Sequence, residues 1–287
     1  MEVVICYYGS YSFQNVLPML KFLIAFYVLV TLYWIGFASH TGSEAGLYFQ
    51  VLLFTMPFIG ALVGFKNASA WGGFTSAVGR AVLFISLGVL SWSIGMIIWN
   101  YYIFIAGIDV PYPSFVDVGY SLSYPLWALG VIAFSKATGV RFALREMRGK
   151  VLLITIPILA IAASYYLLVN VARGGSIAID FSNALKVFFD FYYPIGSAIV
   201  LAITLTFVSL SNDFFGGKYK TPILILIAAL IVQYVADFSF SYTTTNGTYF
   251  NGYFPDFLFM TAMFLFALSL ALMSPPGSAA RQVGNET

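Results

Sequence analysis

Long, continuous runs of apolar residues alternate with short polar or turn-rich connections along this chain. A helix needs roughly 20 apolar residues to cross a bilayer. Eight runs reach about that length, and they lack the period-two alternation of a membrane β-barrel. The sequence therefore predicts eight transmembrane helices, at about 16–38, 47–65, 80–106, 116–136, 150–171, 184–211, 221–243 and 254–273.

The composition supports a membrane protein over the whole chain. Hydrophobic residues make up 61% of the 287 residues and charged residues only 8%. That leaves too few polar side chains to cover a soluble globule of this size. We therefore expect an all-α polytopic protein of the cell membrane, with one membrane domain over 1–273 and a short cytoplasmic tail over 274–287.

The two halves of the chain carry similar residues in the same order. Pro57 and Pro194 lie 137 positions apart, and Asp117 and Asp256 lie 139 apart. This pairing predicts a tandem 4+4 repeat. The predicted repeats are about 16–136 and 150–273. Because four helices is an even number, both copies should have the same, parallel orientation, related by an axis along the membrane normal.

Basic residues are concentrated on one side of the predicted helices. Eleven of the 13 lysines and arginines fall on the side that carries both termini, and only Arg173 and Lys186 fall on the other. The positive-inside rule then predicts that both termini are cytoplasmic. The basic loop 136–150 is expected to contact anionic lipid or a cytoplasmic signalling partner.

Acidic residues lie instead in the outer half of the predicted bundle. Asp117 and Asp256 each follow a turn-rich segment at the start of a helix, and Asp237 lies well inside another helix. Charged groups within a membrane span normally face a bundle interior or a watery cavity and mark function. The alternative is a structural hydrogen-bond network in which the first two aspartates cap helices.

Packing of the duplicated motifs around the repeat axis predicts one outer, ligand-binding cavity. Its predicted members are Asn100, Tyr101, Asp117, Tyr120, Gln233, Asp237 and Asp256. Two other patterns predict internal contacts. Gly60 and Gly64 have the small-xxx-small spacing of a close helix contact, and Lys186 stands one turn before Asp190, where the two can form an ion pair.

Several of these motifs together resemble a known family. They are Pro111-Tyr112-Pro113-Ser114, Asp117, Tyr120, Tyr124-Pro125-Leu126, Tyr193-Pro194, Val235-Ala236-Asp237, Gly247-Thr248-Tyr249, Gly252 and Asp256. Over about 45–273 the chain resembles the eight-helix membrane sensor regions that precede GGDEF and EAL domains in bacterial cyclic-di-GMP enzymes, and some histidine kinases. The resemblance implies a sensory module. No coiled-coil linker or output domain follows the last helix here, so we expect a stand-alone sensor that signals through a separate partner.

The sequence leaves two other functions open, a small-molecule transporter and an accessory or structural membrane subunit. We expect no enzyme activity, because no nucleophile pair, zinc motif or phosphate loop is present. His40 is the only histidine, so we expect neither haem nor a histidine-based metal site. We predict no cofactor, no metal and no nucleic-acid partner; the lipid bilayer is the expected surrounding.

Overall fold

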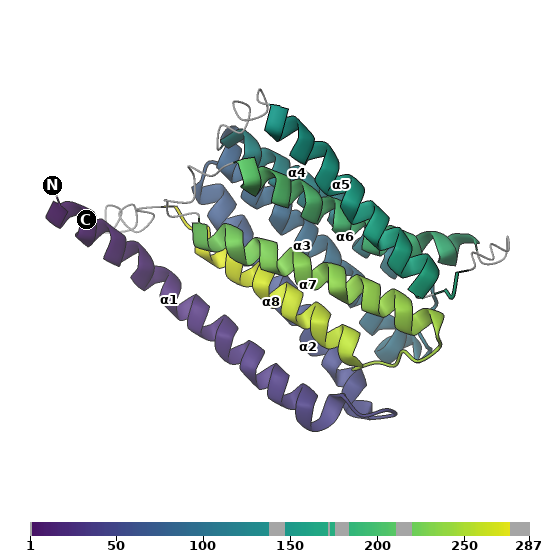
Figure 1. Cartoon of the computed structure of the whole chain (residues 1–287). Coiled ribbons are helices and arrows are strands. Elements are labelled where there is room, and N and C mark those ends of the chain that lie inside the picture. Colours follow the sequence, from purple (N-terminus) through teal and green to yellow (C-terminus); the bar gives the residue numbers. More distant parts are fainter. Residues whose placement is uncertain (1, 138–146, 172, 176–183, 211–219, 276–287) are drawn as a thin grey trace.

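The computed structural model describes residues 2–137, 147–171, 173–175, 184–210 and 220–275, and long helices dominate this part of the chain (Figure 1). The long helices are α1 (Glu2–Tyr33), α2 (Glu44–Ala70), α3 (Ala77–Tyr101), α4 (Val116–Ala137), α5 (Met147–Tyr166), α6 (Ala184–Leu210), α7 (Lys220–Thr245) and α8 (Phe254–Leu272). Three of them continue into short π-helical turns, which are η1 (Trp34–Ala38), η3 (Tyr102–Ala106) and η5 (Leu167–Val171).

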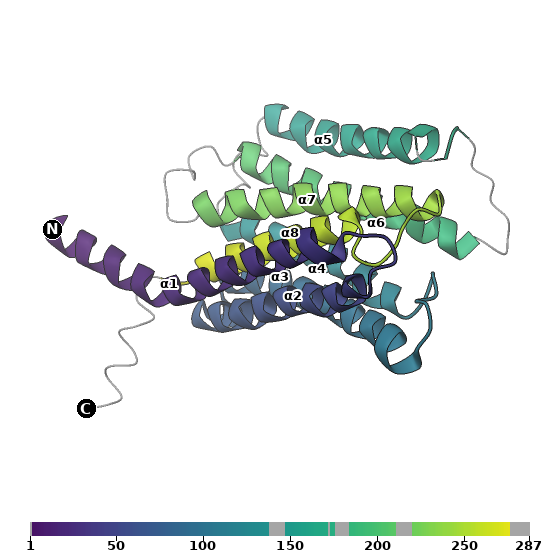
Figure 2. The ribbon, with the colours of Figure 1, turned by 90° about the horizontal axis from the view of Figure 1, so that it is seen from below.

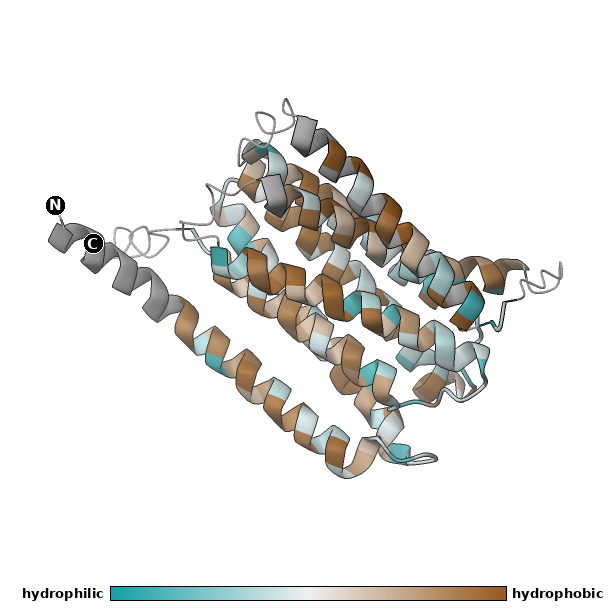
Figure 3. Cartoon of the chain, viewed as in Figure 1, coloured by the Kyte–Doolittle hydropathy of each residue, from teal (hydrophilic) through white to brown (hydrophobic). Residues whose placement is uncertain are grey.

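The membrane class predicted from the sequence is confirmed in its general form. Within the described residues, seven helices are long and apolar enough to cross a bilayer: α1 to α4 and α6 to α8. Hydrophobic positions cover most of their length (Figure 3). The remaining long helix, α5, packs beside α6 (Figure 2). An eighth span therefore stays a prediction.

The helices form a bundle in which α3 and α8 are the most enclosed spans. Helix α8 packs against α7, α2 and α1, and α3 packs against α2 and α4. Helix α1 lies on the outside of the bundle (Figures 1 and 2), where Tyr27 stacks on Phe264 of α8 with ring centroids 4.2 Å apart. The start of α1 and the end of α8 lie at the same end of the bundle (Figure 1). We call that end the inner end and the opposite end the outer end; the side of the membrane that each faces stays a prediction.

Polar residues in the connections fix where the helices start. Ser43 caps α2 by accepting a hydrogen bond from the Ala45 amide at 3.2 Å, and Ser76 caps α3 through the Gly79 amide at 2.8 Å. Gly252, in the α7–α8 loop, has a φ of +87°, and a Cβ there would lie 2.8 Å from the Cα of Gly46. Only glycine lets this loop close so tightly over the start of α2.

Small residues permit close helix contacts inside the bundle, as the sequence predicted. A Cβ on Gly60 would lie 2.7 Å from the Cβ of Ala267 in α8, and Gly64 faces Ser86 of α3. The small-xxx-small motif of α2 therefore serves internal packing.

Two regions named from the sequence lie largely beyond the described residues. The structure describes only the two ends of the basic loop 136–150, and residues 276–287 of the predicted tail are not described. The predicted roles of both regions stay predictions.

Candidate functional site

A cavity lies near the outer end of the bundle, among α2, α3, α4, α6, α7 and α8. The loops that join α3 to α4 and α7 to α8 form part of its wall. Its lining is Gln50, Leu53, Trp92, Met96, Trp99, Pro111, Tyr112, Ser114, Val116, Asp117, Tyr120, Tyr124, Tyr193, Asp237, Phe240, Tyr249, Asp256 and Phe259. The volume open to the centre of a water-sized sphere is about 40 Å³, enough for a few water molecules or a small ion.

The structure brings four of the seven predicted residues to this cavity: Asp117, Tyr120, Asp237 and Asp256. Gln233 lies directly behind the lining, where its amide nitrogen donates to Asp237 at 3.1 Å.

The other two predicted residues do not line the cavity. Asn100 lies behind Gln50 and donates to that residue's backbone carbonyl at 3.2 Å. Tyr101 is 51% exposed and stands edge-to-face with Tyr102, so the structure separates it from the other six. Tyr101 is the last residue of α3, and its side chain lies on the surface of the bundle instead of in the cavity wall.

Asp117 is held at the start of α4 by one contact from its own loop and one from α6. The Ser114 amide, which precedes the helix, donates to this first-turn carboxylate at 2.5 Å, as in the back-bond of a capping box. The Tyr193 hydroxyl of α6 donates to the other carboxylate oxygen. With only 3% of its surface exposed, Asp117 depends on these protein donors rather than on bulk water.

Asp256 has the equivalent place at the start of α8. It accepts from the Gly252 amide at 2.7 Å, from the Gln50 side chain of α2 at 2.6 Å and from the Tyr249 hydroxyl at 3.0 Å. Burial, followed by the nearby Asp256 carboxylate, raises the pKa of Tyr249 well above its ordinary value, so this loop tyrosine stays protonated and remains a donor.

Asp237 lies deeper in the bundle, about 12 Å from the outer end of α7 at 1.5 Å per residue. The Tyr124 hydroxyl of α4 donates to one carboxylate oxygen at 2.8 Å, and Gln233, one turn away, donates to the other. Asp237 is 3% exposed.

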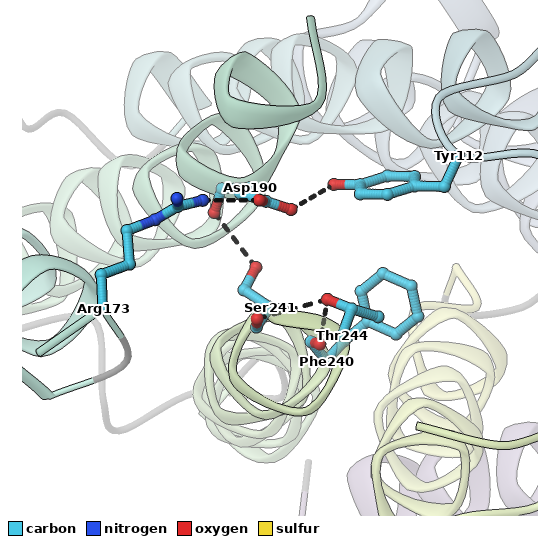
Figure 4. Close-up of polar contacts among 6 residues, drawn as sticks. All are labelled: Tyr112, Arg173, Asp190, Phe240, Ser241 and Thr244. Atoms are coloured by element: carbon cyan, nitrogen blue, oxygen red, sulfur yellow. Dashed lines mark hydrogen bonds and ion pairs between the residues drawn. The ribbon is translucent and has the colours of Figure 1, made fainter. Parts of the chain in front are cut away.

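A fourth aspartate, Asp190 of α6, lies beside the cavity and joins its wall to the α5–α6 connection (Figure 4). One oxygen accepts from the Tyr112 hydroxyl at 2.8 Å, and the other forms an ion pair with Arg173 at 2.6 Å. The predicted pairing with Lys186 is therefore wrong, because a cation distant in sequence takes that place. Burial and the neighbouring carboxylate raise the pKa of Tyr112 above its ordinary value, so Tyr112 too remains a donor.

The sequence reasoning missed one feature that these sites share: each of the four aspartates buried in the described part of the chain accepts a hydrogen bond from a tyrosine hydroxyl. The pairs are Tyr193 with Asp117, Tyr124 with Asp237, Tyr249 with Asp256, and Tyr112 with Asp190. All four tyrosines stand in the turn-rich or proline-containing motifs of the sequence, which was the available signal. Their partners are not readable from spacing, because three of the four pairs join different helices or loops.

The inner side of the cavity is closed by packed aromatic rings. Trp127 of α4 stacks on Phe266 of α8 with ring centroids 4.6 Å apart, and both are almost fully buried. Nearer the inner end, Asn67 of α2 donates to the Leu270 carbonyl at 2.8 Å, and Trp71 donates to the Met273 carbonyl at 2.8 Å. In this conformation the cavity therefore has a floor and does not continue to the inner end.

Comparisons with known proteins supply no assignment for this arrangement. No protein-family profile matches the chain, and no curated protein and no solved structure gives a significant match. The resemblance to membrane sensor regions therefore stays a prediction from the motifs.

Proposed function

We propose that this chain is a sensor- or receptor-type membrane module that binds a small ligand in its outer cavity and signals through a separate partner. The observation that carries this proposal is the origin of the three aspartates that line the cavity. Asp117 comes from the first half of the chain, α1 to α4, whereas Asp237 and Asp256 come from the second half, α5 to α8.

Each of these aspartates accepts a hydrogen bond from the opposite half. Tyr193 of the second half donates to Asp117 of the first. In the reverse direction, Tyr124 and Gln50 of the first half donate to second-half aspartates, at 2.8 Å and 2.6 Å. A ligand that competes for the carboxylates would weaken the bonds between the halves. If the ligand binds one arrangement of the two halves more tightly than another, it shifts the population toward the arrangement that it prefers.

The helix pairing supports the predicted 4+4 repeat. Helix α2 packs against α8, and α6 packs against α4, which is the exchange of contacts that a two-fold axis between the halves requires. Such an axis would pass through the cavity, because residues from the starts of both α4 and α8 line it.

A transporter is the weaker reading of this geometry. An alternating-access pathway needs a polar route toward each side in turn. The stack of Trp127 and Phe266 closes the inner side of the cavity, and the contacts of Asn67 and Trp71 join α2 to α8 beyond it. An accessory subunit without a ligand would use the three carboxylates only for these hydrogen bonds within the bundle, and it would leave the open space between them without a role.

The proposal is tested with full-length protein in lipid nanodiscs, labelled at the inner ends of the two halves. Ala137 and Thr221 are exposed there, and replacing both by cysteine, after Cys6→Ser, permits spin-label distance measurements. A panel of small cations, anions and neutral compounds is screened first for raising the unfolding temperature. We expect at least one compound to stabilise the protein and to change the distance between the labels.

The Asp117→Asn, Asp237→Asn double variant is the control for the cavity. It should lose both the stabilisation and the distance change. If no compound of any charge class acts on the wild type, or if hits act equally on the double variant, the receptor function is wrong. Uptake of a hit into proteoliposomes would instead favour transport.

A further inference from the structure

We infer that the cavity, given the proposed function, binds a small organic ammonium ion that carries N–H donors, such as a primary amine in its protonated form. The first support is an imbalance of charge. Three buried aspartates line the cavity, and its lining, as far as the structure describes the chain, contains no lysine, arginine or histidine. Buried carboxylates are costly unless a cation or a set of donors compensates them. The ion pair of Arg173 is made with Asp190, which lies outside the lining.

The second support is independent of charge and comes from counting hydrogen-bond donors. Every tyrosine that lines the cavity already donates its hydroxyl hydrogen. The five are Tyr112, Tyr120, Tyr124, Tyr193 and Tyr249, with acceptors on Asp190, Met96, Asp237, Asp117 and Asp256. The Gln50 amide also donates to Asp256. The tyrosine hydroxyls still offer lone pairs on oxygen to a ligand, whereas the Gln50 amide keeps one further N–H. A ligand that fits the five tyrosines therefore brings its own donors.

Unpartnered buried atoms next to the cavity have the same character. Gln233 is 0% exposed, and it turns its amide nitrogen to Asp237 while its carbonyl oxygen has no partner in the described part of the chain. The side-chain oxygen of Asn100, behind Gln50, is likewise buried and unpartnered. Both atoms are acceptors. Within the described ranges, the one buried side-chain donor without a partner is on Trp127, which belongs to the aromatic floor and not to the lining.

Aromatic rings complete a surface suited to an organic cation. Trp92 and Tyr120 stack in the wall with ring centroids 5.2 Å apart, and Trp99, Phe240 and Phe259 also line the cavity. The faces of such rings attract cations. A metal ion is the poorer fit, because among the described residues no three acidic, histidine or cysteine side chains are grouped closely enough to hold one.

The test compares four small probes on wild-type protein in nanodiscs: ethylammonium, tetramethylammonium, ethanol and acetate. Tetramethylammonium is the largest of the four. Binding is measured by isothermal titration and by the fluorescence of the tryptophans in the cavity wall. Ethylammonium has charge and donors, whereas tetramethylammonium has charge alone. We expect ethylammonium to bind about tenfold more tightly than tetramethylammonium, because only ethylammonium can donate hydrogen bonds to the carboxylate and tyrosine oxygens of the lining. Ethanol and acetate should not bind measurably.

Variants then locate the site. Asp237→Asn should weaken ethylammonium binding about tenfold or more. The matched control is Asp109→Asn, which removes an exposed aspartate of the α3–α4 loop that does not line the cavity. It should bind ethylammonium as the wild type does. The probe comparison on the wild type needs no variant, so it decides the question even if Asp237→Asn fails to fold.

Three outcomes overturn the inference. They are no binding of ethylammonium, equal or tighter binding of tetramethylammonium, and an equal loss in the Asp109 control, which would indicate a general surface field. The proposed function fails separately. If a compound without an ammonium group moves the inner labels, the receptor stands and the ligand class is wrong. If ethylammonium binds but the labels do not move, the ligand class stands and the signalling is wrong.

Discussion

Two adjacent tyrosines of α6 offer a matched test of the contacts between the halves. The Tyr193 hydroxyl donates to the Asp117 carboxylate, and the Tyr192 hydroxyl donates to the backbone carbonyl of Ser121 at 2.8 Å. Both bonds run from α6 to α4. A phenylalanine at either position removes one oxygen atom and one interhelical hydrogen bond. The two substitutions therefore differ mainly in whether the acceptor that loses its partner is a carboxylate or a neutral carbonyl.

The expected costs follow from the acceptors. A hydrogen bond to a charged group contributes about 1.5–3 kcal/mol, whereas hydrogen bonds between helices in a membrane average about 0.6 kcal/mol. Asp117 is 3% exposed, so bulk water does not replace the lost donor, and only the Ser114 amide remains. We expect Tyr193→Phe to lower the free energy of unfolding by about 1.5–3 kcal/mol and Tyr192→Phe by about 0.6 kcal/mol.

The assay is reversible unfolding of the purified protein in mixed lipid and detergent micelles, with increasing dodecyl sulfate and circular dichroism as the signal. A double-mutant cycle with Asp117→Asn isolates the pair. In the Asp117→Asn background, Tyr193→Phe should cost only about as much as a neutral bond, about 0.6 kcal/mol. The reasoning is refuted if the two phenylalanine variants are equally stable, or if the cost of Tyr193→Phe is the same with aspartate and asparagine at 117.

Three further predictions concern pH, packing and orientation. Above about pH 10, the ordinary pKa of tyrosine, the unfolded chain loses phenolic protons that Tyr112 and Tyr249 keep in the fold, where their pKa is raised. The free energy of unfolding should therefore fall as the pH rises above about 10. In the Tyr112→Phe, Tyr249→Phe double variant, the free energy of unfolding should depend less on pH between about pH 8 and 11. Gly60→Ala should cost about 1–3 kcal/mol by overpacking, whereas Gly36→Ala, with open space around its Cβ, should be neutral or slightly stabilising; equal costs in an unfolding titration would contradict the close contact of α2 with α8. A reporter enzyme that works only in the cytoplasm should be active when it is fused after residue 287, since the basic loops predict that the termini are cytoplasmic. Activity of a periplasmic or extracellular reporter at the same position would contradict the predicted orientation.

The sequence by itself determined the helices of this protein and their class. The apolar run predicted at 116–136 is observed as Val116–Ala137, and the run predicted at 184–211 as Ala184–Leu210. This succeeds because a backbone in lipid must satisfy its hydrogen bonds locally, so that the length and continuity of an apolar segment fix the helix. Motif spacing also indicated that Asp117, Asp237 and Asp256 converge, since the positions within each motif set which helix end or face carries the carboxylate.

Only the tertiary structure decided which groups meet those carboxylates. The helical period gives the face on which Tyr193 or Tyr124 stands, but the rotation and separation of α6 and α4 decide which aspartate each tyrosine reaches. The same limit explains why Asp190 pairs with Arg173, from a connection distant in sequence, rather than with Lys186 one turn away. It also explains why Tyr101, one position after Asn100, faces away from the cavity. Contacts between helices depend on close approaches such as that of Gly60 to Ala267. The packing of all the helices together sets these approaches, so the sequence of a single helix does not predict them.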